Sequence, residues 1–308
     1  MKMKFTMTPS YSGRSITVLK QTLLATLFAS MAFSASAALK MEVYNPGEKS
    51  VFPVSSEIIT GEHDALLIDA QFQRNDAEKL VEKIRATGKN LKTIYISHHD
   101  PDFYFGLDVL KAAFPNAQIV ATPQTIAAIN ATKDKKVAYW GPILKDNAPK
   151  QVVVPQALNT DHLTLEGNNI DIVGLKGATP DRTFVWIPSL KAVVGGVHTS
   201  ANIHVWVADT QTVASRQHWL ADLDAIDKLK PTTVVPSHYL PNKDGSAPWS
   251  PKNVDFTRQY LKTFEQNVSS SANSTALIDA MKRAYPDLGE PASLELGAKV
   301  IKGEMQWP

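Results

Sequence analysis

Residues 96–106 read ISHHDPDFYFG and begin where an apolar, strand-like run at 91–97 ends. His98, Asp100 and Asp102 alternate along a chain that leaves a strand, so an extended backbone would aim all three to one side. Imidazole nitrogen and carboxylate oxygen are ligands that suit zinc, iron or manganese. The same residues are also typical of a capped acidic turn before a helix that starts near Gly106. The stretch alone therefore leaves a metal site and a structural turn both open.

Strands and helices alternate on both sides of this stretch. Apolar runs predict strands within 62–70 and at 91–97, 117–121, 169–177, 182–188, 191–197 and 232–239. Helical spacing predicts helices at 75–88, 106–114, from Pro123 onward, at 212–229 and in the last seventy residues. Residues 133–156 lack clear periodicity and are expected to form a long loop, placed near an active site. This order predicts sheets covered by helices in one domain of the α/β or α+β class.

The first 37 residues have the features of a signal peptide. Basic residues precede an uncharged apolar run at 22–37, which ends in the small-x-small pattern Ala35-Ser36-Ala37. The run is short for a membrane span, so cleavage fits better than the alternative, an uncleaved anchor. We expect residues 1–37 to be removed. Residues 38–308 would then form a periplasmic or secreted domain without a stable membrane anchor.

Composition excludes several other classes of protein. The 308 residues contain 32 basic and 30 acidic side chains, so no basic field for a nucleic acid is expected. The absence of cysteine excludes disulfides, thiolate metal ligands and a cysteine nucleophile. Any metal ligands must therefore be His, Asp or Glu. The expected partner is a small-molecule substrate, and composition does not predict the oligomeric state.

Four stretches resemble, in their order, the metallo-β-lactamase superfamily and in particular an exported hydrolase branch of it. They are ISHHDPDFYFGL (96–107), GATPDRTFVWIPSLKAVVGG (177–196), NIHVWVADTQT (202–212) and HWLADLDAIDKLKPTTVVPSHY (218–239). The resemblance extends from Asp64 to Tyr239 and includes the order of strands and helices. It implies a metallo-β-lactamase-type αββα sandwich, with two packed β-sheets flanked by helices, and a metal-dependent hydrolase activity.

The metal-binding motifs of that family are degenerate in this chain. In the first motif, HxHxDH, an aspartate stands in place of the second histidine. The ligand-competent positions that remain are His98, Asp100, Asp102 and His238. Apolar side chains replace the last histidine of HxHxDH (Phe103), the histidine of the G-H-T-P turn (Ala178) and the bridging aspartate (Val197). Two cations without a bridging carboxylate would repel one another, so a single ion is expected.

The predicted cofactor is therefore one divalent metal ion, zinc in the first place, with iron or manganese as alternatives. The four remaining ligand-competent side chains complete such a site. Water activated there would attack an ester, thioester, lactone or related bond. Asp102 or Asp100 is the predicted general base. The predicted substrate contacts are His204, Trp206 and Tyr104.

Two other functions stay open at this point. One is a catalytically silent family member that binds a small molecule or a partner in the old active-site cleft, which the three apolar replacements favour. The other is redox chemistry on a di-iron site, for which too few ligands remain. If the four side chains fill every coordination position of the ion, no position is left for substrate, and the ion would be structural. Convergence of the four side chains on one point would favour a metal role.

Several further residues match family positions near the site. Those expected to shape it are Asp69, Asp209 and Trp219. Asp69 would either orient a metal-binding histidine or cap a turn. His198 lies beside the lost bridging position and is a candidate replacement ligand. His99 is expected to point away from His98 on an extended chain.

Overall fold

The computed structural model describes Met1 and residues 38–307, so the predicted signal peptide lies outside the described residues apart from Met1. The strands are β1 (Lys40–Tyr44), β2 (Ser56–Thr60), β3 (Asp64–Ile68), β4 (Asn90–Ile96), β5 (Gln118–Ala121), β6 (Gln156–Ala157), β7 (His162–Leu165), β8 (Asn168–Val173), β9 (Phe184–Ile187), β10 (Ala192–Val194), β11 (Ser200–Ala201), β12 (Thr233–Val234) and β13 (His238–Tyr239). The α-helices are α1 (Arg74–Ala86), α2 (Pro101–Tyr104), α3 (Leu107–Ala113), α4 (Pro123–Leu144), α5 (Val213–Leu229), α6 (Lys252–Ser270), α7 (Ser274–Ala284) and α8 (Pro291–Ile301).

The strands form two main sheets and one small one. The first sheet has the order β1-β2-β3-β4-β5-β6, antiparallel from β1 to β3 and parallel from β3 to β6. The second has the order β12-β10-β9-β8-β7, and β11 pairs with β13. Because β3 and β4 are parallel, the residues that follow them leave the sheet at the same edge. This edge brings Asp69 next to the ISHHDPDFYFG segment.

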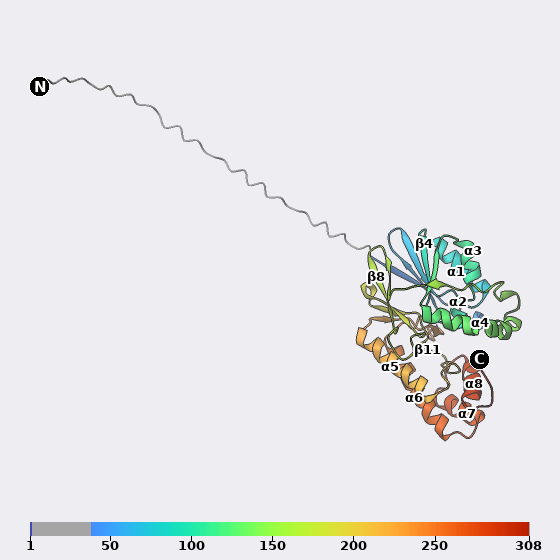
Figure 1. The fold of residues 1–308 in the computed structure, drawn as a ribbon. Helices are drawn as coiled ribbons and strands as arrows, with labels where there is room; N and C mark the ends of the chain where they lie inside the picture. Colours follow the sequence, from blue (N-terminus) through green and yellow to red (C-terminus); the bar gives the residue numbers. More distant parts are fainter. Residues whose placement is uncertain (2–37, 308) are drawn as a thin grey trace. The chain divides into compact units, whose positions relative to one another are not determined.

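Three hydrophobic cores give the layers of the domain. The first lies between one face of the first sheet and helices α1, α3 and α4. The second fills the space between the two sheets, with side chains such as Ile68 and Val194. The third packs α5, α6, α7 and α8 against the outer face of the second sheet. Figure 1 shows α1 to α4 on one side of the sheets and α5 to α8 on the other. The predicted αββα sandwich is confirmed.

A glycine fixes the position of the segment that carries the site. The amide of Gly106 donates to the carbonyl of Gln71 over 2.9 Å, and the amide of Ala70 donates to the carbonyl of Phe103 over 2.7 Å. A Cβ at position 106 would lie 2.1 Å from the carbonyl oxygen of Ala70, which no side chain tolerates. The short helix α2 is thereby held against the loop that follows β3.

The main error of the sequence analysis concerns residues 133–156. Helix α4 runs through to Leu144, so the first half of this segment is helix rather than loop. Thr122 caps the helix by accepting from the amide of Thr125 over 3.1 Å, and Pro142 lies close enough to the C-terminus to be accommodated. Helix α1 begins at Arg74, one residue before the predicted start, and the side chain of the preceding Gln73 makes no cap hydrogen bond.

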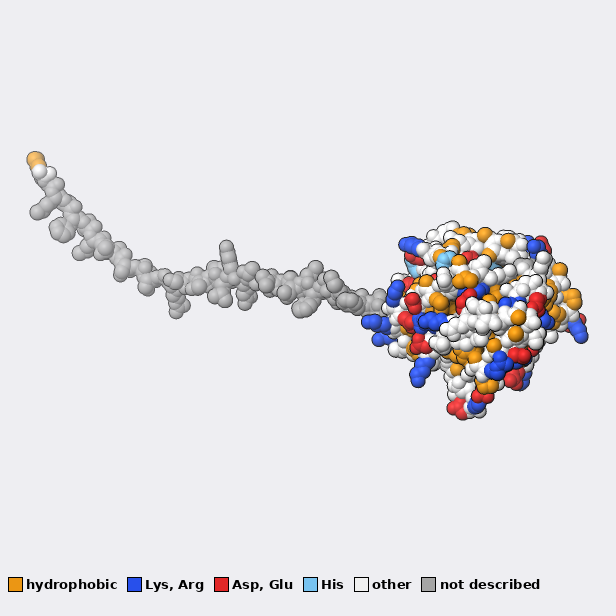
Figure 2. All heavy atoms as spheres, turned by 90° about the horizontal axis from the view of Figure 1, so that it is seen from below, with side chains coloured by type: hydrophobic (Ala, Val, Ile, Leu, Met, Phe, Trp, Pro, Cys, Tyr) orange, Lys and Arg blue, Asp and Glu red, His pale blue; other side chains and the backbone are white. Residues whose placement is uncertain are grey.

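The surface carries charges of both signs. Figure 2 shows Lys and Arg side chains interspersed with Asp and Glu on the face that it presents. That pattern agrees with the near-balance of charge in the sequence and offers no single-sign field on this face. Within residues 38–307, no helix combines the length and the apolar character needed to cross a membrane.

Candidate active site

Two histidines and an aspartate meet where β4 ends. The rings of His98 and His99 lie 4.3 Å apart between centroids. Nδ1 of His98 is 3.4 Å from Oδ2 of Asp100, and Nδ1 of His99 is 3.9 Å from Oδ1 of the same residue. Each of the three offers a donor atom within 4.8 Å of the other two. The prediction that His99 points away from His98 is wrong, because the chain turns into α2 instead of continuing as a strand.

The environment of this cluster suits a cation. Burial lowers the pKa of His98 well below its usual value, so the imidazole is neutral at neutral pH, and its Nδ1 accepts from the amide of Asp100 over 3.1 Å. Nε2 of His98 and Nδ1 of His99 are buried and have no hydrogen-bond partner among the described residues. Burial alone would raise the pKa of Asp100, but the ammonium of Lys136 and the nearby histidines hold it well below its usual value. The carboxylate is therefore ionised.

Asp102 and His238 form a second pair in the same cleft. Nε2 of His238 lies 2.5 Å from Oδ2 of Asp102, although the two residues are 136 positions apart in the sequence. The pairing of β11 with β13 brings His238 to this place. The four predicted ligands thus occur as two pairs, His98 with Asp100 and Asp102 with His238.

A buried lysine, which the sequence pattern does not predict, lies beside the cluster. Nζ of Lys136, on α4, lies 3.5 Å from Oδ1 of Asp100 and 3.4 Å from Oδ1 of Asp209. It also lies 4.7 Å from the ring centroid of Trp307. Asp209 in addition accepts from the indole N–H of Trp307 over 2.9 Å and from that of Trp206. The ammonium of Lys136 therefore already neutralises part of the acidic charge at this site. Asp209 holds that ammonium and two indole rings in place.

An aromatic wall closes one side of the cleft. The rings of Phe52, Trp140, Trp206 and Trp307 pack edge-to-face on one another, with centroids 5.2–6.3 Å apart. All four line the cleft together with Asp100, Asp102, Lys136, Arg182, His204 and His238. An apolar substrate would find a large surface here, next to the charged groups.

Comparison with known proteins agrees with this architecture. The family model of the metallo-beta-lactamase superfamily matches residues 50–238. The chain belongs to the metallo-beta-lactamase superfamily. A metallo-beta-lactamase from Pontibacter korlensis has a similar structure, with a TM-score of 0.51 and 19% identity, covering 74% of this chain and 96% of that one. The DIM-1 metallo-beta-lactamase reaches a TM-score of 0.48 and 19% identity, covering 73% and 94%. At this identity the likeness to the Pontibacter korlensis protein shows the fold alone. A search of curated proteins found no match.

Two of the apolar residues that the resemblance places at ligand positions lie beside the four ligand-competent side chains. Phe103 is fully buried, and its ring lies 5.4 Å from that of His98 and 5.6 Å from that of His238. It therefore packs against the histidine of each pair. Val197, which the resemblance places at the bridging position, lines the cleft with an apolar side chain. Members of this superfamily usually bind divalent metals, and the cluster that remains here is His98, His99 and Asp100.

The other predicted site residues lie in different surroundings. His204 and Trp206 line the cleft, and Nδ1 of His204 is 3.0 Å from the hydroxyl of Tyr260. Tyr104 is fully buried in the first core and is not part of the cleft lining, so a substrate contact is not expected from it. His198 is buried with Nε2 3.6 Å from Oδ2 of Asp222, apart from the histidine–aspartate cluster.

Asp69 and Trp219 have supporting roles. Oδ1 and Oδ2 of Asp69 accept from the amide and the hydroxyl of Ser97 over 2.8 and 2.6 Å. That hydroxyl accepts from the amide of Gly196 over 2.7 Å. Asp69 therefore fixes the residue just before His98 and not a histidine itself. Trp219 donates its indole N–H to the carbonyl of His198 over 2.9 Å, which ties α5 to the loop after β10.

Proposed function

We propose that this protein is a hydrolase that cleaves an ester, thioester, lactone or related bond in a small molecule, using one divalent ion. The observation that supports this is the cluster of His98, His99 and Asp100, in which Nε2 of His98 and Nδ1 of His99 are buried without a partner among the described residues. Two imidazoles and one carboxylate are a donor set that catalytic zinc and iron sites use, with positions left for water and substrate. The ligand types thus fit such an ion.

Residues of the cleft would activate the water and bind the substrate. A bound divalent ion supplies a Lewis acid that makes water acidic and polarises a carbonyl group. Asp102 would accept the proton from water at Oδ1, because Oδ2 is already paired with His238. His238 would stabilise that carboxylate and pass the proton towards the mouth of the cleft, where it is partly exposed. The aromatic wall would hold the apolar part of the substrate and exclude water.

Metal analysis of the mature protein tests this function. We expect about one zinc, iron or manganese ion per chain after purification without chelator or affinity metal, measured by plasma mass spectrometry. His98→Ala should lose the ion and the hydrolysis of ester and lactone substrates. His218→Ala is the matched control, because His218 is exposed on α5. A metal-free wild-type protein with no esterase or lactonase activity would contradict the proposal.

A second candidate function is binding without catalysis. Lys136 favours it, because its ammonium neutralises Asp100 without any metal ion. The three apolar replacements point the same way. In that case the cleft would bind a small molecule, and removal of metal would leave its affinity unchanged.

We also propose that the protein is exported to the periplasm or secreted. The support is the basic N-terminus, the apolar run and the Ala35-Ser36-Ala37 pattern. Expression of the full chain in a bacterium should yield a mature protein of residues 38–308 in the periplasmic or extracellular fraction. Intact mass spectrometry checks the cleavage point, and full-length protein held in the inner membrane would contradict the prediction.

A further inference from the structure

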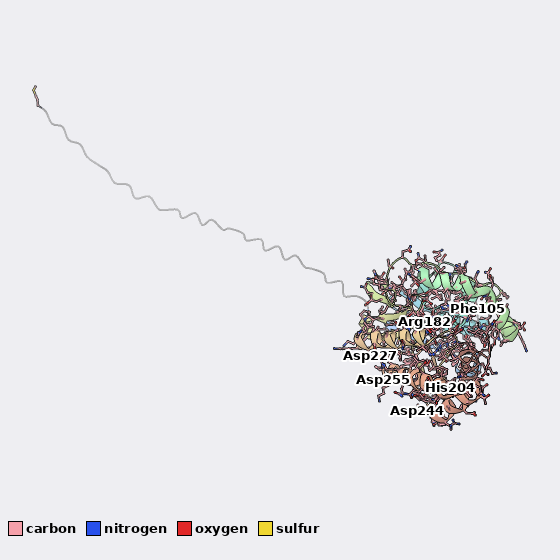
Figure 3. The ribbon with its side chains drawn as sticks, turned by 60° about the horizontal axis from the view of Figure 1, so that its bottom comes forward. Phe105, Arg182, His204, Asp227, Asp244 and Asp255 are labelled. Atoms are coloured by element: carbon pink, nitrogen blue, oxygen red, sulfur yellow. The ribbon has the colours of Figure 1, made fainter. Side chains whose placement is uncertain are left out.

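Arg182 is a buried cation that lines the cleft without an ionic partner. Only 8% of the residue is exposed, and its guanidinium carbon lies 5.0 Å from the ring centroid of Trp219. Nε is buried and has no hydrogen-bond partner in the described part of the chain. No carboxylate among residues 38–307 lies within ion-pair distance of its side chain. Figure 3 labels Arg182 together with His204, which lines the same cleft.

The lysine and the three aspartates that line the cleft already have partners. Lys136 is shared between Asp100 and Asp209, and Asp102 is paired with His238. A guanidinium that is buried with no carboxylate at ion-pair distance is costly, because only the contact with the Trp219 ring and the more distant charge of Asp100 offset its desolvation. Its five N–H donors have a fixed fork geometry that matches a carboxylate in a bidentate manner. Stacking on Trp219 holds this fork in place without using those donors.

We propose that Arg182 binds a carboxylate group of the substrate, so that the substrate is a small carboxylic acid that also carries the hydrolysable bond. The inference rests on the proposed function of the cleft. A monoanion fits better than a phosphate dianion, because Asp100, Asp102 and Asp209 lie in the same cleft and would repel additional negative charge. The aromatic wall predicts a second feature of this substrate, namely an apolar or aromatic group next to the carboxylate.

Binding of a matched pair of probes tests the assignment. Phenylacetate carries the carboxylate and an aromatic ring, whereas phenylacetamide has the same shape without the charge. We expect calorimetric titration to give at least tenfold tighter binding of phenylacetate to the wild-type protein. Arg182→Gln should remove this preference, and Arg182→Lys should retain part of it, since lysine keeps the charge but not the bidentate geometry.

Thermal unfolding separates ligand recognition from a purely structural role. Without ligand, Arg182→Gln should unfold at the same or a higher temperature than wild type, because a buried unpaired charge is removed. Phenylacetate should raise the unfolding temperature of wild type but not of this variant. A variant that is less stable without ligand and still prefers phenylacetate would overturn the proposal.

The same titration in His98→Ala distinguishes this inference from the metal site. If Arg182 holds the carboxylate, His98→Ala keeps the preference for phenylacetate although it has lost the ion and the activity. If His98→Ala loses the preference and Arg182→Gln keeps it, the carboxylate binds to the ion, and the assignment to Arg182 is wrong. A metal-free wild-type protein that still prefers phenylacetate would refute the hydrolase and leave the carboxylate site standing.

Discussion

Replacement of Glu57 by glutamine is expected to remove a large part of the pH dependence of the protein's stability. Glu57 lies on β2 and is fully buried, and neither of its carboxylate oxygens has a hydrogen-bond partner among the described residues. Burial, together with the charge of Asp69, raises its pKa to about 8. The carboxyl group is therefore protonated in the folded protein at neutral pH.

The direction of the effect follows from proton binding in the two states. The ordinary pKa of a glutamate side chain is 4.5, and the pKa of Glu57 in the folded protein is about 8. Between these two pH values the folded protein holds a proton that the unfolded chain releases. Rising pH therefore favours unfolding by about 1.4 kcal/mol per pH unit, which amounts to roughly 5 kcal/mol over this window. Glu57→Gln should match wild type near pH 4.5 and be several kcal/mol more stable at pH 8. Burial also raises the pKa of Asp69 to about 8, so about half of the total slope should remain.

Urea unfolding of the mature protein between pH 5 and 8.5 checks this prediction. Glu78→Gln is the control, because Glu78 is exposed on α1 and should leave the slope unchanged. A second variant, Asp69→Asn combined with Glu57→Gln, should remove nearly all of the slope if it folds. Equal slopes for wild type and Glu57→Gln would mean that Glu57 is ionised in the folded state, contrary to the expectation.

Much of the fold could be predicted because its elements have clear local patterns. The apolar runs at β4, β9 and β10 and the regular spacing along α5 are properties of short segments. Helix α4 was missed beyond its first turns, since its lysines and Pro142 interrupt any apolar stripe. Its most buried charged residue, Lys136, also violates the expectation that lysine lies at the surface.

The candidate site was predicted only in part, because its members meet across long distances in the sequence. The resemblance identified His98, Asp100, Asp102 and His238. The resemblance gave no indication that Lys136 or Arg182 belongs to the site. The ion pairs of Lys136 and the lack of an ion pair at Arg182 within the described residues both depend on tertiary packing. Asp209 and Trp307 are 98 residues apart and form a direct hydrogen bond. The orientation of His99 was wrong because an extended chain was assumed where the backbone turns into α2.

Replacement of Lys136 by methionine is expected to destabilise the metal-free protein by about 3–5 kcal/mol. Methionine fills most of the volume but removes the ammonium that both buried carboxylates, Asp100 and Asp209, contact. Urea unfolding at pH 7 with chelator present measures the loss. Lys135→Met is the matched control, because Lys135 is exposed on the same helix. Lys136→Arg keeps the charge and should lose much less.

A divalent ion should restore the stability that Lys136→Met loses. An ion bound at His98, His99 and Asp100 supplies positive charge at the carboxylate that the ammonium neutralised, and it no longer meets repulsion from that ammonium. Zinc titration followed by unfolding should therefore stabilise Lys136→Met more than wild type and show tighter binding to the variant. A loss below about 1 kcal/mol would mean that the ion pairs of Lys136 are weak. A full loss without rescue by zinc, iron or manganese would favour the metal-free binding protein, because the ammonium would then be the only cation that this acidic centre accepts.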